Sequence, residues 1–186
     1  MLVWDIDDVF NSLTMEIAGI LGVKLPSTEP WYPNPASFML AQGIKQETYI
    51  DCLDNFRRVG FLDLEPKNEV LQWFVLHGHE YANFALTSTP IEFFANSASW
   101  VLRHFSPWIE GIGFTPSRRD TDPPGVQYLT KSQYLQRFRK PYLLIDDSLE
   151  NTANIDHALG AGIQFPTPWN SAGNVNEFLG KINEII

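Results

Sequence analysis

Two acidic pairs lie far apart in the sequence, and each follows a short apolar run. Asp5 and Asp7 come after LVW, and Asp146-Asp147 comes after YLLI. An Asp-x-Asp pair by itself is common in solvated turns, and in isolation that interpretation is favoured. The apolar runs, however, are typical of buried parallel strands, and adjacent strands could bring Asp146 beside Asp5. Carboxylates that converge in this way repel one another unless a hard cation lies between them. Oxygen ligands without a nearby His or Cys favour Mg²⁺.

The rest of the chain alternates between patterns typical of strands and patterns typical of helices. Apolar runs that end in polar residues predict strands at 2–4, 83–86, 126–129 and 142–145. Helical apolar spacing predicts helices through Val70, Phe74 and Leu76, through 93–101, and through Ile155, Leu159 and Ile163. This alternation favours an α/β fold with a parallel sheet. Ligands bind at the carboxyl ends of such strands, so the polar strand ends are expected to share one site.

Residues 13–65 interrupt the alternation and predict a helical insert. Helices are expected near 13–21 and 46–59, with a Pro-rich connector from Pro26 to Pro35 between them. The insert carries several aromatic residues and could form a lid over the strand ends. The segment 115–125 contains three prolines and predicts a loop.

Composition limits the function classes. The 186 residues, 44% hydrophobic and 19% charged, predict one folded domain with a small insert. A net charge of −9 argues against a long nucleic acid as partner, although small phosphorylated substrates remain possible. No apolar run approaches the ~20 residues of a membrane span, and the start MLVWDIDDVF lacks the features of a signal peptide. A cytoplasmic protein is therefore expected. The sequence does not indicate an oligomeric state.

Four segments together resemble the motifs of the haloacid dehalogenase superfamily of phosphohydrolases. DIDDV, with Asp5 and Asp7, resembles the first motif, and Thr87 in ALTS resembles the hydroxyl of the second. Lys131 in YLTK resembles the lysine of the third, and LLIDD, with Asp146, resembles the fourth. In this order the motifs span nearly the whole chain.

The resemblance implies a Rossmann-like three-layer α/β/α fold. The catalytic core would be 1–12 and 66–186, and 13–65 would be a helical cap inserted after the first strand. It also implies a Mg²⁺-dependent phosphatase in which Asp5 is the nucleophile and Asp7 is the general acid/base. Mg²⁺ would be held by Asp5, the Asp7 backbone carbonyl and Asp146. Phosphate would contact Lys131 and two hydroxyl side chains, Thr87 and Ser88. Asp147 and Asn151 would hold metal-bound water or Lys131.

Within the superfamily, the sequence resembles the 5′(3′)-deoxyribonucleotidase group, through LTS, LTK, LLIDD and Pro168-Trp169-Asn170. A nucleoside monophosphate is therefore the favoured substrate. The spacing from Lys131 to Asp146 is longer than that group usually shows. Three other residues therefore remain open as the third-motif cation, namely Arg137, Arg139 and Lys140.

Three aromatic residues of the insert, Trp31, Tyr32 and Phe56, could stack on a nucleobase. Packing inside the insert explains them equally well. Arg118 and Arg119 could reach a substrate phosphate, although paired basic residues in a loop are more often solvated. Two other functions remain open: a phosphatase of another small metabolite or of a polynucleotide end, and a catalytically weak protein that binds a phosphorylated ligand or a protein partner. Asp7 favours activity, because a pure binder needs no general acid.

Overall fold

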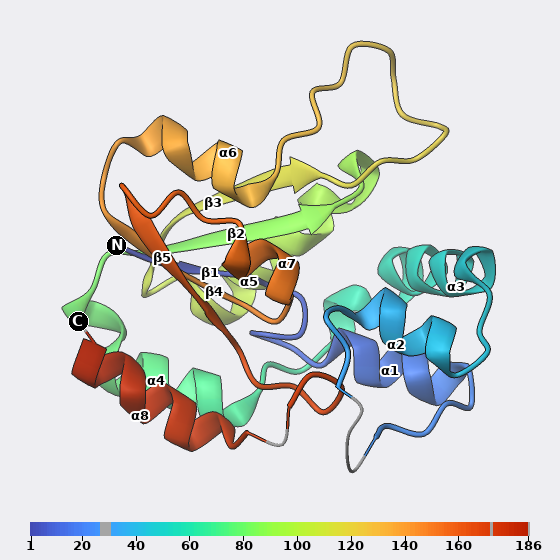
Figure 1. The fold of residues 1–186 in the computed structure, drawn as a ribbon, viewed down its shortest axis with the longest axis horizontal. Coiled ribbons are helices and arrows are strands. Elements are labelled where there is room, and N and C mark those ends of the chain that lie inside the picture. The colour runs from blue at the N-terminus through green and yellow to red at the C-terminus, as the bar shows by residue number, and fades with distance from the viewer. Residues whose placement is uncertain (27–30, 172, 186) are drawn as a thin grey trace.

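A five-stranded parallel sheet forms the centre of the computed structural model, which describes residues 1–26, 31–171 and 173–185 (Figure 1). The strand order is β3-β2-β1-β4-β5, and every neighbouring pair is parallel. The strands are β1 (Leu2–Trp4), β2 (Asn83–Thr89), β3 (Ile109–Pro116), β4 (Tyr142–Asp146) and β5 (Gly160–Gln164).

The short strand β1 lies in the middle of the sheet. Trp4 pairs with Ala85 of β2 on one side and with Ile145 of β4 on the other. Asp5 therefore leaves the carboxyl edge of the sheet beside Asp146, as the two apolar runs predict.

Helices cover both faces of the sheet, which confirms the expected three-layer α/β/α architecture. One face packs against α4 (Asn68–His77), α5 (Phe94–Phe105) and α8 (Val175–Ile185), and Trp4 lies 5.1 Å from Phe74 between ring centroids. The other face packs against α6 (Lys131–Leu135), where Val3 and Leu144 meet Leu135. The remaining core elements are the 3-10 helices η2 (Gly78–Glu80), η3 (Ile91–Phe93) and η4 (Gln136–Phe138), and α7 (Leu149–Ala153).

The expected insert is helical and lies beside the carboxyl ends of the strands (Figure 1). It contains α1 (Leu13–Ile20), α2 (Pro35–Ala41), α3 (Gln46–Val59) and the 3-10 helix η1 (Phe61–Asp63). Part of the predicted Pro-rich connector, 27–30, lies outside the described residues. Ile17 and Phe38 belong to the same buried apolar cluster as Phe10 and Trp4, so the insert packs on the sheet through a continuous core.

Two local predictions are wrong. Residues 126–129 form no strand, because they lie on the surface with Tyr128 40% exposed and therefore have no apolar face to bury. Leu159 and Ile163 are not on a helix: α7 ends at Ala153, and 160–164 form the edge strand β5.

No helix in the described part of the chain is both long enough and apolar enough to cross a membrane.

Candidate active site

Asp5 is fixed where β1 meets the turn that follows it. Its backbone N–H donates to the Ile145 carbonyl at 2.9 Å, and its Oδ1 accepts a hydrogen bond from the backbone N–H of Ile6 at 2.7 Å. The turn reverses at Asp8, which has a φ of 63° in the left-handed region. Thr14 of α1 stabilises this conformation, since its N–H donates to the Asp8 carboxylate at 2.8 Å. The sharp turn places Asp7 in the cavity above Asp5.

Lys131 is the cation at the end of the sheet. It is the first residue of α6, and a capping box between Thr130 and Gln133 fixes the start of that helix. Its Nζ lies 2.7 Å from Asp5 Oδ1 and 2.6 Å from Asp146 Oδ2, and its side chain is 1% exposed.

The three alternative cations do not lie near Asp5. Arg137, Arg139 and Lys140 are exposed, and none of them lines the cavity. Of the four basic residues that the sequence offers as the third-motif cation, Lys131 is therefore the one that contacts Asp5.

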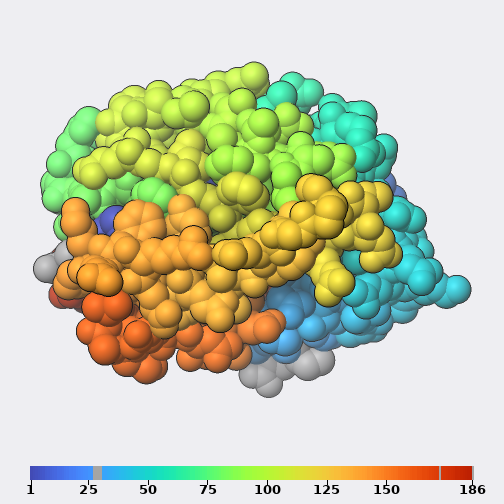
Figure 2. Space-filling view, turned by 90° about the horizontal axis from the view of Figure 1, so that it is seen from above, coloured from blue at the N-terminus to red at the C-terminus, as the bar shows by residue number. Residues whose placement is uncertain are grey.

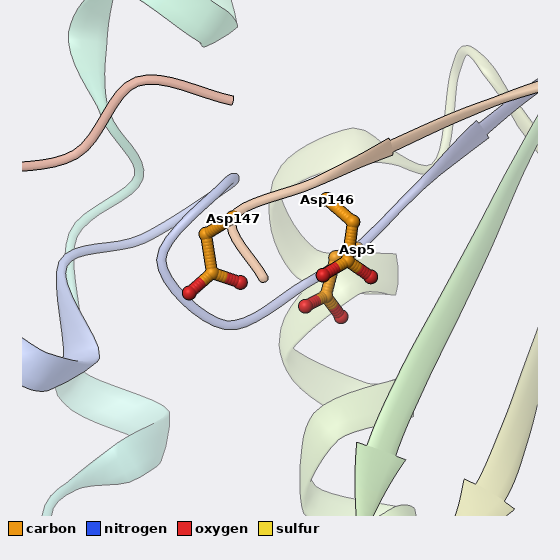
Figure 3. Close-up of side chains that lie close together, drawn as sticks. All are labelled: Asp5, Asp146 and Asp147. Atoms are coloured by element: carbon orange, nitrogen blue, oxygen red, sulfur yellow. The ribbon is translucent and has the colours of Figure 1, made fainter. Parts of the chain in front are cut away.

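Asp146 and Asp147 are bound differently. Both Asp146 oxygens have partners, because Oδ2 meets Lys131 while Oδ1 accepts from Ser148 N–H at 2.9 Å and from Asn151 Nδ2 at 3.0 Å. Among the described residues, no side chain or backbone donor meets the Asp147 carboxylate, which is buried and lines the cavity. Asp5, Asp146 and Asp147 each place one oxygen within 4.8 Å of the others (Figure 3).

Burial makes this carboxylate cluster costly to charge. Burial raises the pKa of Asp5 to about 7, and the charge of Lys131 only partly offsets this effect. Burial and the neighbouring Asp146 hold the pKa of Asp147 well above its usual range. Burial also opposes the charged form of Lys131, but Asp146 and Asp5 outweigh it and raise its pKa. The cluster therefore holds three carboxylates, Asp5, Asp146 and Asp147, beside the one ammonium group of Lys131.

These residues fit a hard divalent cation. A cation favours the ionised form of nearby carboxylates, and Mg²⁺ is usually bound by one or two carboxylates plus water and substrate oxygens. Asp5 and Asp147 are the carboxylates with oxygens available to it, whereas Asp146 is already engaged. The geometry thus favours Asp147 over Asp146 as the second carboxylate ligand, and Asp146 as the residue that orients Lys131.

Several solved structures have a fold similar to that of this chain. No family model and no curated protein sequence matches the chain. A haloacid dehalogenase-like family hydrolase from Streptococcus pneumoniae superposes with a TM-score of 0.59 at 10% identity, covering 99% of this chain and 96% of that one. A predicted phosphatase from Clostridium acetobutylicum gives 0.55 at 18% identity, with 98% and 97% covered. The chain has a haloacid dehalogenase-like fold. A third structure, described as a haloacid dehalogenase-superfamily hydrolase from Ehrlichia chaffeensis, superposes with a TM-score of 0.54 at 10% identity, with 99% of this chain and 96% of that one covered.

On this haloacid dehalogenase-like framework, the second acidic residue of the first motif meets an arginine of the insert. Arg57 Nη2 lies 2.5 Å from Asp7 Oδ2, with side chains 6% and 14% exposed. Arg57 is not among the site residues predicted from the sequence. Its helical spacing could have pointed to it. Residues four apart share one face of a helix, and Tyr49, Leu53 and Arg57 of α3 follow this spacing and all line the cavity.

Of the two hydroxyl residues predicted to bind phosphate, Ser88 lines the cavity and Thr87 does not. Ser88 lines the cavity and its Oγ lies 2.8 Å from Thr115 Oγ1, whereas Thr87 is fully buried and does not line it. Successive residues of a strand point to opposite faces, so only one of the two can point into the site.

The three aromatic residues that could have stacked on a nucleobase do not line the cavity. Trp31 lines a separate depression with Pro166 and Pro168, Tyr32 packs on Phe38 at 5.5 Å, and Phe56 lines a third depression. The aromatic residue that does line the cavity is Tyr49, which is 8% exposed. The cavity measures about 280 Å³ and thus suits a small ligand.

Mg²⁺ should stabilise the folded chain. A ligand that binds only the folded form raises the free energy of unfolding by about 2.7 kcal/mol at 100 times its Kd. For a chain of this size we expect Tm to rise by roughly 5 to 10 °C, measured by thermal denaturation with Mg²⁺ and with EDTA. Asp147→Asn should remove most of this rise, while the exposed-site control Asp51→Asn should keep it. An equal rise in all three proteins would argue against Asp147 as a ligand.

Proposed function

We propose that this protein is a Mg²⁺-dependent phosphomonoesterase that acts through an aspartyl-phosphate on Asp5. The observation that carries the proposal is that Asp5, at the carboxyl edge of the sheet, contacts Lys131 and lies within the same carboxylate cluster and cavity as Asp147, with Asp7 lining that cavity from the turn after β1. The solved structures of similar fold support it, since those named above are described as hydrolases or as a predicted phosphatase.

Each residue has a role in the proposed reaction. The Asp5 carboxylate attacks phosphorus, and Asp7 protonates the leaving oxygen. Asp7 then takes a proton from the water that hydrolyses the aspartyl-phosphate. Lys131 and Ser88 bind phosphoryl oxygens, and the positive charge of Lys131 offsets their negative charge. Mg²⁺, held by Asp5, Asp147 and the Asp7 carbonyl, would shield the phosphate so that a carboxylate can approach it.

A small phosphate ester fits the cavity better than the placement of the aromatic residues fits a nucleotide. The preference for a nucleoside monophosphate came from the resemblance to the deoxyribonucleotidase group. The aromatic residues that could have stacked on its base, Trp31, Tyr32 and Phe56, do not line the cavity. Stacking on Tyr49 is the contact that a nucleobase could still make.

A phosphatase screen with the full-length chain tests the proposed function. Nucleoside monophosphates, sugar phosphates and three-carbon phosphate esters are incubated with Mg²⁺, and phosphate release is measured before and after EDTA. We expect release from small esters that EDTA abolishes and added Mg²⁺ restores. Binding of these esters without any release, in the presence of Mg²⁺, would support a phospholigand-binding protein instead.

A further inference from the structure

Arg57 is a buried cation with donors left to use. Its side chain is 6% exposed, it lines the same cavity as Asp5, and its Nε has no hydrogen-bond partner among the described residues. Guanidinium groups bind carboxylates and phosphates through two parallel N–H donors. In the described structure Arg57 uses one nitrogen on Asp7, so its capacity for an anion is only partly used.

The partner of Arg57 is the residue that the proposed reaction needs free. Asp7 Oδ2 accepts from Arg57, and Asp7 Oδ1 is buried with no partner in the described part of the chain. While this ion pair persists, Asp7 is held away from a leaving group. A competing anion of the substrate would release Asp7.

A second arginine at the cavity, Arg119, already has a carboxylate partner. Arg119 also lines the cavity, but its Nε and Nη2 donate to both oxygens of Asp54 on α3, at 2.7 and 2.8 Å. This bidentate pair joins the segment 117–130 to α3, and Figure 2 shows that segment running over the surface to the insert. The contact holds α3, and with it Arg57, over the carboxyl ends of the strands.

We propose that Arg57 selects phosphate monoesters whose leaving group carries a second anionic group, a carboxylate or another phosphate. The inference rests on the proposed function, since the phosphate to be cleaved binds at Asp5, Lys131 and Ser88. Arg57 comes from the insert helix α3 and contacts Asp7, the residue that would protonate the leaving oxygen, so the anion that it binds would belong to the leaving group. When that anion takes over Arg57, the Asp7 carboxyl group is free to contact the leaving oxygen.

A matched series of three-carbon esters tests this selection. Glycerol 3-phosphate has a neutral far end, 3-phosphoglycerate has a carboxylate there, and propanediol bisphosphate has a second phosphate. We measure kcat/KM with Mg²⁺ for the wild type, Arg57→Ala, Arg57→Lys and Arg58→Ala. Arg58 is the control, because it follows Arg57 on α3 but is 56% exposed and lies outside the cavity.

The wild type should prefer one or both of the doubly anionic esters over glycerol 3-phosphate. Arg57→Ala should lower that ratio of kcat/KM roughly 10- to 150-fold, the range expected for losing a hydrogen bond to a charged group. Arg57→Lys should retain part of the ratio, because it keeps the charge but not the forked geometry. Arg58→Ala should leave the ratio as in the wild type. A wild type without preference, or equal losses on all three esters in Arg57→Ala, would overturn the proposal.

Calorimetry separates this inference from the proposed function. Asp5→Asn and Asp5→Asn/Arg57→Ala are titrated with 3-phosphoglycerate and glycerol 3-phosphate in the presence of Mg²⁺. Tighter binding of 3-phosphoglycerate that depends on Arg57 supports the selection even if the wild type hydrolyses neither ester, in which case the phosphatase proposal alone fails. Equal affinity for both esters, together with turnover that shows no preference, rejects the selection and leaves the phosphatase proposal intact.

Discussion

Asp5→Asn should lower kcat about 10³-fold or more while the chain stays folded. The amide nearly preserves the volume of the side chain, and its oxygen can still accept the hydrogen bond from Ile6 N–H, now at 2.7 Å. It cannot attack phosphorus to give a stable acyl-phosphate. Activity is measured on the best ester from the screen, and folding is followed by thermal denaturation.

Trapping of the covalent intermediate and a control variant test whether Asp5 is the nucleophile. Acid quenching of the wild type during turnover of a phosphorus-labelled ester should trap label on the protein, and Asp5→Asn should trap none. The exposed-site control Asp51→Asn should behave as the wild type in both assays. A well-folded Asp5→Asn protein that keeps more than about a few per cent of the activity would reject covalent catalysis through Asp5.

Lys131→Met should be the most destabilising substitution in the site. Lys131 is 1% exposed and lies between Asp5 and Asp146, so its removal leaves two buried carboxylates without their cation. Removing one partner of a buried ion pair typically costs about 3 to 5 kcal/mol, and Met fills most of the space without a charge. The free energy of unfolding is measured by urea denaturation in EDTA.

Mg²⁺ distinguishes a charge effect from a packing effect in this variant. If charge is the cause, Mg²⁺ should stabilise Lys131→Met by more than it stabilises the wild type, because the ion partly replaces the missing cation. The exposed control Lys140→Met should change stability little. If Mg²⁺ raises the free energy of unfolding of the wild type and of Lys131→Met by the same amount, the stability lost in Lys131→Met comes from packing.

The residues with strong local signals were predictable from the sequence, and so was the parallel sheet. Asp5 and Asp146 follow continuous apolar runs at the ends of central strands, and such runs are readily recognised as buried strands. Lys131 was identified through its motif, although the strand expected before it does not exist.

The edge strands and the insert contacts were less predictable, for physical reasons. β3 and β5 contain glycines that weaken a strand pattern, yet close packing requires them: a Cβ at Gly111 would lie 2.7 Å from the Phe84 ring, and one at Gly162 would collide with the Thr152 backbone. Arg57 and Ser88 depend on which face of an element meets the cavity, and a single sequence fixes that only after the tertiary packing is known.

The central position of β1 has a consequence for how the protein is made. Its partners Asn83 and Leu143 lie 81 and 141 residues beyond Leu2, so β1 cannot complete its pairing until most of the sheet has been synthesised. Contacts between residues so distant in sequence form slowly, and unpaired strand edges expose a chain to aggregation in the meantime. Asp5, the proposed nucleophile, thus acquires its surroundings only after residue 146 has been made. Nascent chains that stop before that point contain Asp5 but lack Asp146 and Asp147 beside it.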